Sequence, residues 1–377
     1  MRPAGSLLRV IFRFCSLGFT LIVTACGGGG GGGAAPATNI PRYAFVANNG
    51  DNSVSSYVVD AAAGRLRYIG KVATGANPNS VTVDPSGKYA YVANNASANI
   101  SQYTIGADGA LTPIAPLTAV AKRGPVSLAM TKGTTAAQAV PNYAYAANAN
   151  DYNVSQYTIG ADGALTPMAA ATVAAGSCAT SVTVDPSGKY AYVANGCSSN
   201  VSQYTIGADG ALTPMATATV AAGSGPDCVT VDPSGSYAYV ASGGIGNVVL
   251  QYTIGADGAL TPMATPTVAA GTGPHCVTVD PSGKYAYVTN YNSNNVSQYT
   301  IGANGALTPM ATATVAAGKF PVSVAVDLTG RYAYVANANS ADVSQYTIGA
   351  SGALTPMATA TVAAGSTFSV TTVGSWQ

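Results

Sequence analysis

The feature that most constrains this chain is a sequence motif that repeats along its length. Each copy contains a Tyr-Ala-aromatic segment, a small Asn-rich loop, a polar strand and a final segment that contains Gly residues. The seven copies start at Tyr43, Tyr89, Tyr143, Tyr190, Tyr237, Tyr285 and Tyr332. Successive copies are 46, 54, 47, 47, 48 and 47 residues apart. Such a period, with several short strands per unit, is typical of a β-propeller, and seven units are enough to close a ring. We therefore predict an all-β, seven-bladed propeller over residues 40–377.

One copy of the repeat divides into four short strands. In the fourth copy they are expected at residues 181–184, 189–195, 200–206 and 211–220. The first two strands are separated by the turn Asp185-Pro186-Ser187-Gly188, and Asp209-Gly210 provides a hairpin before the last strand. Pro214 lies in the last strand and cannot donate to a sheet ladder, so this strand belongs on an outer edge. Each copy is thus predicted to be a four-stranded antiparallel blade.

The two ends of the chain are expected to share one blade. Inner strands should start near Ser80, Ser127, Ser181, Cys228, Cys276 and Ser323. The first copy lacks an inner strand, because it opens directly at its second strand. Residues 368–373 repeat the missing pattern, with Ser369 at the position of Ser or Cys. We predict that this C-terminal strand completes the first blade and removes the free sheet edges of an open array. A β-solenoid is the alternative, but its repeats are usually shorter and lack paired hairpins.

Charge is scarce in this chain, and its balance excludes one class of partner. Only 8% of the residues are charged, the chain has no Glu, and all 14 acidic residues are Asp. Beyond residue 13, twelve Lys and Arg stand against these 14 Asp, a net charge of −2. A basic stripe along a phosphate backbone cannot be built from that balance, so we expect no nucleic-acid partner. We also expect a monomer that uses no cofactor.

The first 26 residues have the order of an export signal. Arg2, Arg9 and Arg13 give a positive start, and the apolar stretch at residues 14–23 is too short to span a bilayer as a helix. The run Val23-Thr24-Ala25-Cys26 resembles the bacterial lipobox, in which the signal is cut before a Cys that then carries lipid. Seven glycines follow it directly, as a flexible tether would.

This order predicts three segments: a lipoprotein signal peptide at residues 1–25, a lipidated Cys26 with a Gly-rich tether up to residue 39, and the propeller. The membrane would then be a partner through the lipid on Cys26, because several acyl chains on one Cys hold a protein stably. The expected location is the bacterial cell envelope, periplasmic or at the cell surface. An ordinary secretory signal with an incidental Cys is the alternative.

Two sequence motifs resemble a known family. Tyr287-Val288-Thr289-Asn290 is the YVTN sequence, and the related Tyr-Val-Ala-Asn recurs in several other copies. Together with the Val-Asp-Pro-Ser-Gly-Lys-Tyr-Ala-Tyr-Val run that ends at Val193, it resembles the YVTN-repeat, lactonase-type seven-bladed propellers, which include 6-phosphogluconolactonase-like and muconate-cyclising proteins. The resemblance covers residues 40–377 and implies the fold. It does not fix the chemistry, because proteins that share a fold differ in function.

The residues that this resemblance would carry over mostly differ here. Members of the lactonase group show Gly-Pro-Arg-His before the inner strand and Asn-Glu after the second strand. The nearest match is Gly273-Pro274-His275-Cys276 with Asn290-Tyr291. His275 therefore stands at the Arg position and Cys276 at the His position, and no Glu completes the set.

One face of the propeller is the expected site of function. The loops from outer to inner strand and from second to third strand share this face, and the copies diverge most there. Its candidate ligand-binding residues are Asn79, Arg123, Thr180, Asp227, His275, Lys319 and Phe368. Asp227 and His275 hold equivalent positions in adjacent copies, and an imidazole beside a carboxylate can activate water or a hydroxyl. The alternative is that a single surface His has no chemical role.

Other residues on this face have both a functional and a structural interpretation. The Asn-rich loops, such as residues 148–153 and 290–295, offer amides suited to sugars or peptides, but Asn also tolerates turn dihedrals. Lys122-Arg123 and Lys319-Phe320 are candidates for contact with an anionic partner. No Cys-x-x-Cys or His-x-x-x-His spacing and no Asp-rich calcium loop occurs, so we expect no metal.

Four cysteines lie in the predicted propeller. The expected register of the inner hairpin in the fourth copy pairs Thr180 with Asn195 and then places Cys178 opposite Cys197. In an oxidising compartment this arrangement predicts a disulfide, with two free thiols as the alternative. Cys228 and Cys276 replace Ser in neighbouring inner strands, and the strict geometry of disulfides leaves their state open.

Two functions fit these features. The leading hypothesis is a membrane-tethered, non-catalytic propeller that presents a binding face to an unidentified protein or carbohydrate ligand. The alternative is a lactonase-like hydrolase, related to 6-phosphogluconolactonase, that uses His275 and Asp227 on a sugar lactone.

Overall fold

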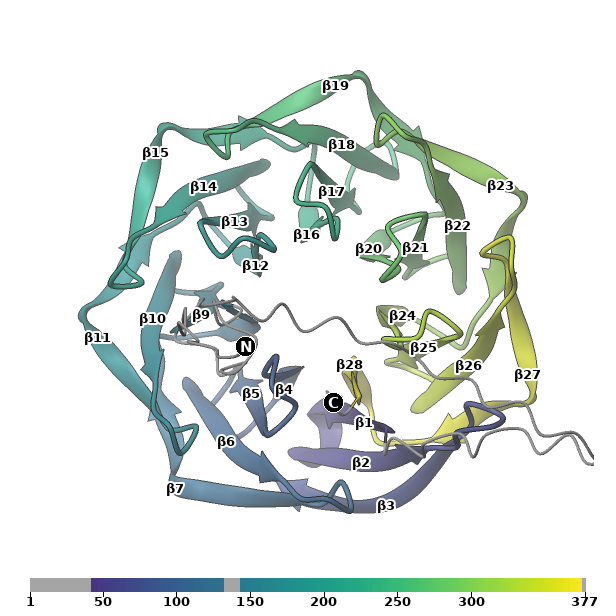
Figure 1. Cartoon of the computed structure of the whole chain (residues 1–377), viewed down its shortest axis with the longest axis horizontal. Helices are drawn as coiled ribbons and strands as arrows, with labels where there is room; N and C mark the ends of the chain where they lie inside the picture. The colour runs from purple at the N-terminus through teal and green to yellow at the C-terminus, as the bar shows by residue number, and fades with distance from the viewer. Residues whose placement is uncertain (1–41, 132–142, 375–377) are drawn as a thin grey trace, which may run out of the picture. The chain divides into compact units, whose positions relative to one another are not determined.

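The structure is a computed structural model that describes residues 42–131 and 143–374 (Figure 1). Its strands belong to one compact unit, residues 39–377. The predicted signal peptide, Cys26 and the Gly-rich tether lie outside the described residues. Within the described part of the chain, no helix is both long and apolar enough to cross a bilayer.

The described residues form seven four-stranded antiparallel sheets arranged as the blades of a ring (Figure 1). From the inner to the outer strand, the first four blades are β28 (Thr367–Gly374), β1 (Arg42–Asn48), β2 (Ser53–Val59) and β3 (Leu66–Ala73); β4 (Pro78–Val83), β5 (Tyr89–Asn94), β6 (Asn99–Ile105) and β7 (Leu111–Val120); β8 (Pro125–Met130), β9 (Tyr143–Asn148), β10 (Asn153–Ile159) and β11 (Leu165–Ala174); and β12 (Ala179–Val184), β13 (Tyr190–Asn195), β14 (Asn200–Ile206) and β15 (Leu212–Ala221).

The remaining three blades are β16 (Pro226–Val231), β17 (Tyr237–Ser242), β18 (Val248–Ile254) and β19 (Leu260–Ala269); β20 (Pro274–Val279), β21 (Tyr285–Asn290), β22 (Asn295–Ile301) and β23 (Leu307–Ala316); and β24 (Pro321–Val326), β25 (Tyr332–Asn337), β26 (Asp342–Ile348) and β27 (Leu354–Ala363). A single 3-10 turn, η1 (Asn49–Asp51), follows β1. The strand boundaries agree with those predicted for the fourth copy to within a residue or two.

The C-terminal strand closes the ring, as predicted. β28 pairs with β1 along its length, from Arg42 opposite Gly374 to Asn48 opposite Thr367, although the two strands lie at opposite ends of the chain. Two hydrogen bonds also join this first blade to the seventh blade. The Val370 amide donates to Ser323 Oγ of β24 at 3.3 Å, and the Tyr57 hydroxyl donates to Ala363 O of β27 at 3.1 Å.

Every inner strand carries a β-bulge near its start, which the sequence did not predict. In the fourth blade Ala179 pairs with Asn195 and Ser181 with Ala194, so Thr180 is left between the two pairs. The predicted pairing of Thr180 with Asn195 was therefore wrong by one residue. A bulge inserts one unpaired residue and redirects its side chain. The seven bulge residues are Phe368, Asn79, Val126, Thr180, Asp227, His275 and Val322.

Tyrosines hold neighbouring blades together. In the fourth blade the buried Tyr192 donates its hydroxyl to Gly258 O, in the β18–β19 turn of the next blade, at 2.6 Å. Five other blades repeat this bond with Tyr91, Tyr145, Tyr239, Tyr287 and Tyr334. The turn needs Gly for two reasons: Gly258 has φ +82, and a Cβ there would lie 2.3 Å from the ring of Tyr190. The glycine turns between third and outer strands thus bind the tyrosines of the preceding blade.

A buried glutamine makes a second link between blades. Gln203 stands at a bulge in β14, where its Nε2 donates to Thr217 O of its own blade at 2.9 Å. Its Oε1 accepts from the Leu260 amide of the next blade at 2.6 Å. Gln102, Gln156, Gln251, Gln298 and Gln345 make the same pair of bonds. From the third to the sixth blade, hydrophobic clusters between these polar links pack Tyr, Val and Ala side chains of adjacent blades against one another.

We predict that deleting the chain after residue 366 strongly destabilises the propeller. The deletion removes β28 and exposes β1 as a sheet edge beside an incomplete blade, so thermal unfolding should occur on the order of 10 °C lower or more. Deletion after residue 374 keeps β28 and serves as the matched control. Circular dichroism melting of the two proteins makes the comparison, and equal melting temperatures would contradict a closed ring.

Candidate functional site

The seven bulge residues stand where each inner strand begins, at the end of the ring that also carries the loops between second and third strands. Thr180, Asp227 and His275 come from three consecutive blades, and contacts between blades connect the bulges. Thr180 Oγ1 donates to Pro226 O, beside Asp227, at 3.0 Å. Asn79 Oδ1 accepts from Asn49 Nδ2 at 2.9 Å. The bulges therefore bring the polar candidates from separate blades to one rim.

His275 has a defined orientation. Its Nδ1 lies 2.8 Å from Val322 O, the carbonyl of the bulge residue in the next blade. A carbonyl oxygen only accepts hydrogen bonds, so Nδ1 carries the proton in this contact. In the neutral ring Nε2 then has the free lone pair, and this nitrogen can take a proton from water or a hydroxyl.

Asp227 lies beside His275 in the preceding blade. Burial raises the pKa of the Asp227 carboxyl, and the neighbouring His275 acts in the opposite direction. No hydrogen bond or ion pair joins these two described side chains. Their interaction is therefore electrostatic, without direct bonding.

The loop of the fifth blade departs from the repeat in a way that accommodates the Asp227 carboxylate. A Cβ at Gly243 would lie 2.9 Å from Asp227 Oδ2 and 3.0 Å from Pro274 O, so any larger residue there would displace the Asp227 carboxylate or the neighbouring backbone. The same blade has Ser242 where the other blades have a buried Asn. In the fourth blade this Asn, Asn195, donates from Nδ2 to Asn200 and Ser202 of the third strand. The fifth blade, which carries Asp227, lacks these bonds.

Two aromatic residues complete this rim. The His275 ring stacks on Tyr291 with centroids 6.0 Å apart, and Tyr291 stacks on Phe320 at 4.4 Å with only 9° between the rings. Phe320 has φ +56 and is held by a bond from its amide to Asn294 Oδ1. Sequence reasoning missed Tyr291 as a site residue. The available signal was that it is the only aromatic residue directly after a second strand.

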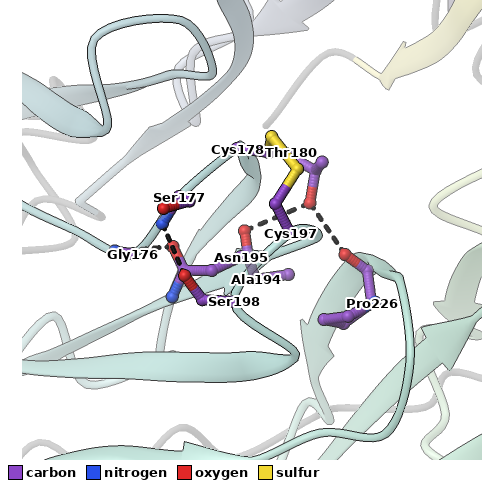
Figure 2. The surroundings of a disulfide bond; sticks show 9 residues. All are labelled: Gly176, Ser177, Cys178, Thr180, Ala194, Asn195, Cys197, Ser198 and Pro226. Carbon is purple, nitrogen blue, oxygen red and sulfur yellow. Dashed lines mark hydrogen bonds between the residues drawn. A yellow bond between two sulfur atoms is a disulfide. The ribbon is translucent and has the colours of Figure 1, made fainter.

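Cys178 and Cys197 are joined by a disulfide, with sulfur atoms 2.04 Å apart (Figure 2). The bridge lies next to Thr180, whose hydroxyl contacts both Ala194 O and Pro226 O (Figure 2). Cys228 and Cys276 are free thiols. Within the described residues no group of three or more His, Cys, Asp and Glu side chains is placed to hold a metal.

The remaining candidate residues from the sequence lie in loops and in other bulges of the same rim. Arg123 and Lys319 are exposed in loops that precede inner strands, and Arg123 Nε forms an ion pair with Asp151 at 2.8 Å. Phe368 is a half-buried bulge residue of β28. The Asn-rich loops contain buried structural amides: Asn148 and Asn290 bond within their own blades.

Comparison with known families agrees with this architecture. The chain matches the family described as Lactonase, 7-bladed beta-propeller, over residues 30–128 and 134–375. The chain belongs to this family. No curated protein matches this lactonase-family chain in sequence.

Solved structures show the same fold at low sequence identity. A putative 6-phosphogluconolactonase from Bacteroides fragilis superimposes with a TM-score of 0.77 and 23% identity, over 90% of this chain and 100% of that one. A putative 6-phosphogluconolactonase from Bacteroides uniformis gives 0.77 and 17%, over 89% and 100%. A periplasmic gluconolactonase from Pseudomonas aeruginosa gives 0.75 and 20%, over 88% and 99%. At these identities the likeness of our lactonase-family chain to each structure establishes the fold alone.

Proposed function

We propose that this protein is a lactonase-type hydrolase that opens a sugar lactone at the rim formed by Asp227 and His275. The observation that carries the proposal is the orientation of His275, whose Nδ1 bond to Val322 O leaves Nε2 as a proton acceptor. The Asp227 carboxyl interacts electrostatically with the same imidazole. Membership of the lactonase family and the likeness to a periplasmic gluconolactonase support it. From the sequence alone, the leading hypothesis was a non-catalytic binding propeller, and the lactonase was the alternative.

The residues suit hydrolysis of a cyclic ester without a covalent intermediate. Nε2 of His275 removes a proton from water as the water oxygen attacks the lactone carbonyl. The negative charge of Asp227 stabilises the imidazolium that forms. The tetrahedral intermediate then collapses, the ring C–O bond breaks, and the imidazolium returns the proton to the leaving alkoxide. The product is a hydroxy acid, and both side chains return to their starting states.

The aromatic pair gives the substrate a surface to lie against. Tyr291 and Phe320 are parallel, half-buried and adjacent to His275, and aromatic faces pack against the apolar faces of sugar rings. Stacking on such rings would hold a lactone ring within reach of the imidazole. Asn79 and Thr180, further along the ring of bulges, supply polar groups for hydroxyls.

We predict that His275→Ala lowers the kcat for hydrolysis of glucono-δ-lactone by about 100-fold or more, because it removes the general base. Lys284→Ala is the matched control, since Lys284 is exposed in the turn between β20 and β21, at the opposite end of β20 from His275. Hydrolysis can be followed by titration of the released acid. If the protein opens glucono-δ-lactone and His275→Ala is as active as the control, the assignment of the base is wrong.

Asp227→Asn should lower activity without lowering stability. The folded-state pKa of Asp227 is raised, so the native protein binds this proton more readily than the unfolded chain does. Stability from this group is therefore present at low pH and is lost as the pH rises toward the raised pKa. The Asn variant has no charged carboxylate to bury, so it should melt at the same or a higher temperature at pH 7. A lower melting temperature together with lower activity would indicate a structural role instead.

A binding scaffold is the second candidate, favoured by one observation. The chain has no Glu at all, and Tyr291 stands where the lactonase group has one. On this proposal the rim binds a carbohydrate or protein without turnover. Calorimetry with glucono-δ-lactone and gluconate, in parallel with the activity assay, separates the two functions, because a scaffold would bind without releasing acid.

We also propose that the mature protein is anchored to a bacterial membrane through lipid on Cys26, with the propeller in the periplasm or at the cell surface. Support comes from the lipobox-like run that ends at Cys26, from the disulfide between Cys178 and Cys197, and from a periplasmic relative of the same fold. Intact-mass analysis should find a mature chain that begins at an acylated Cys26, and Cys26→Ala should abolish membrane fractionation. A mature N-terminus elsewhere, without lipid, would remove the anchor.

A further inference from the structure

One position of the inner strand forms a ring of small polar side chains around the propeller. It follows the bulge residue in every blade, and it is occupied by Ser369, Ser80, Ser127, Ser181, Cys228, Cys276 and Ser323. In four blades the Ser hydroxyl accepts the amide N–H of the next inner strand at 3.2–3.4 Å. The side chain at this position therefore lies over the joint between two blades.

Cys228 and Cys276 occupy this position in consecutive blades. Cys228 Sγ accepts the Val277 amide at 3.4 Å, as the serines do with their neighbours. Because each side chain reaches toward the next blade, the sulfur of Cys228 comes within 3.6 Å of the sulfur of Cys276. Both side chains point the same way around the ring, so the Cys228 sulfur reaches the blade that carries Cys276 and lies close to the Cys276 sulfur.

We propose that Cys228 and Cys276 are a redox-active pair that forms a reversible disulfide across the joint between the fifth and sixth blades. A disulfide needs its sulfurs about 2.04 Å apart, so closure moves them by about 1.5 Å, which small side-chain rotations supply. Both residues are half-buried in the reduced protein. They directly follow Asp227 and His275, and the bond would link the two bulges of the candidate site.

The chemistry is thiol–disulfide exchange with a disulfide-bearing oxidant. The Cys276 thiolate attacks one sulfur of the oxidant and expels a thiolate. The Cys228 thiolate then attacks the Cys276 sulfur of this mixed disulfide and expels the second thiolate. The protein loses two electrons and two protons, and one oxidant disulfide becomes two thiols. The pKa of Cys276 is lowered because it accepts a hydrogen bond from the Cys228 thiol, so Cys276 is the attacking residue.

The test uses the full chain, reduced and then oxidised with glutathione disulfide, with free thiols blocked by N-ethylmaleimide in denaturant. Chymotrypsin cleaves after Tyr237 and Tyr252, so Cys228 and Cys276 fall in separate peptides that only a disulfide can join. Mass spectrometry should find these peptides joined after oxidation and separate after reduction. The oxidised protein should also melt several degrees higher than the reduced protein. The peptides of Cys178 and Cys197 report whether oxidation was complete.

Cys228→Ser is the matched variant, because Ser is the residue at this position in five blades. It should keep the bond to the Val277 amide, fold normally and show no joined peptide. Since reduction also opens the bond between Cys178 and Cys197, any shift in melting that remains in the variant belongs to that bond. Maleimide on both cysteines of the oxidised wild-type chain, or glutathione retained on Cys276 beside a free Cys228, would overturn the proposal. Either result is decisive when Cys178 and Cys197 are found joined in the same sample.

Discussion

The contact on which the rest of this structure depends is the hydrogen bond from a buried tyrosine to a glycine turn of the next blade. A single four-stranded blade cannot bury both of its faces, so it is stable only against neighbours. Tyr192 donates to a Gly258 carbonyl that no larger residue could present, because the turn needs a positive φ and the ring of a second tyrosine, Tyr190, lies against the Gly258 Cα. Burial raises the pKa of Tyr192 well above its usual range, so this hydroxyl stays a protonated donor at ordinary pH.

The candidate site follows from this stacking. Each blade is rotated from the last by the same joint, so equivalent bulge residues from successive blades come to one rim. The structure needs the bulge, but its side chain makes no uniform contact, which frees the position to vary from Asn to Thr, Asp, His, Val or Phe. The rim therefore holds the groups that differ between blades, while the repeated Tyr, Gln, Asn and Gly residues hold the ring.

The repeat period, the turn residues and the unmatched C-terminal segment were sufficient to predict the blades, their strands and the closure of the ring. The bulges were not predictable, because the sequence shows only alternation and gives no sign of the residue left unpaired. That single shift misplaced the partner of Thr180. The stacking of Tyr291 on Phe320 was also out of reach, because it depends on the distance between two blades. By contrast, equivalence of repeat positions did place Asp227 and His275 at matching positions of adjacent blades, where the structure has two consecutive bulges.

Closure of the ring by its own C-terminal strand can be measured by hydrogen–deuterium exchange of the intact protein. The paired amides of residues 367–374 should exchange as slowly as those of the other inner strands, since β28 is paired with β1 and bonded to β24. Exchange of this segment at the rate of an unstructured tail, while the other blades stay protected, would contradict it.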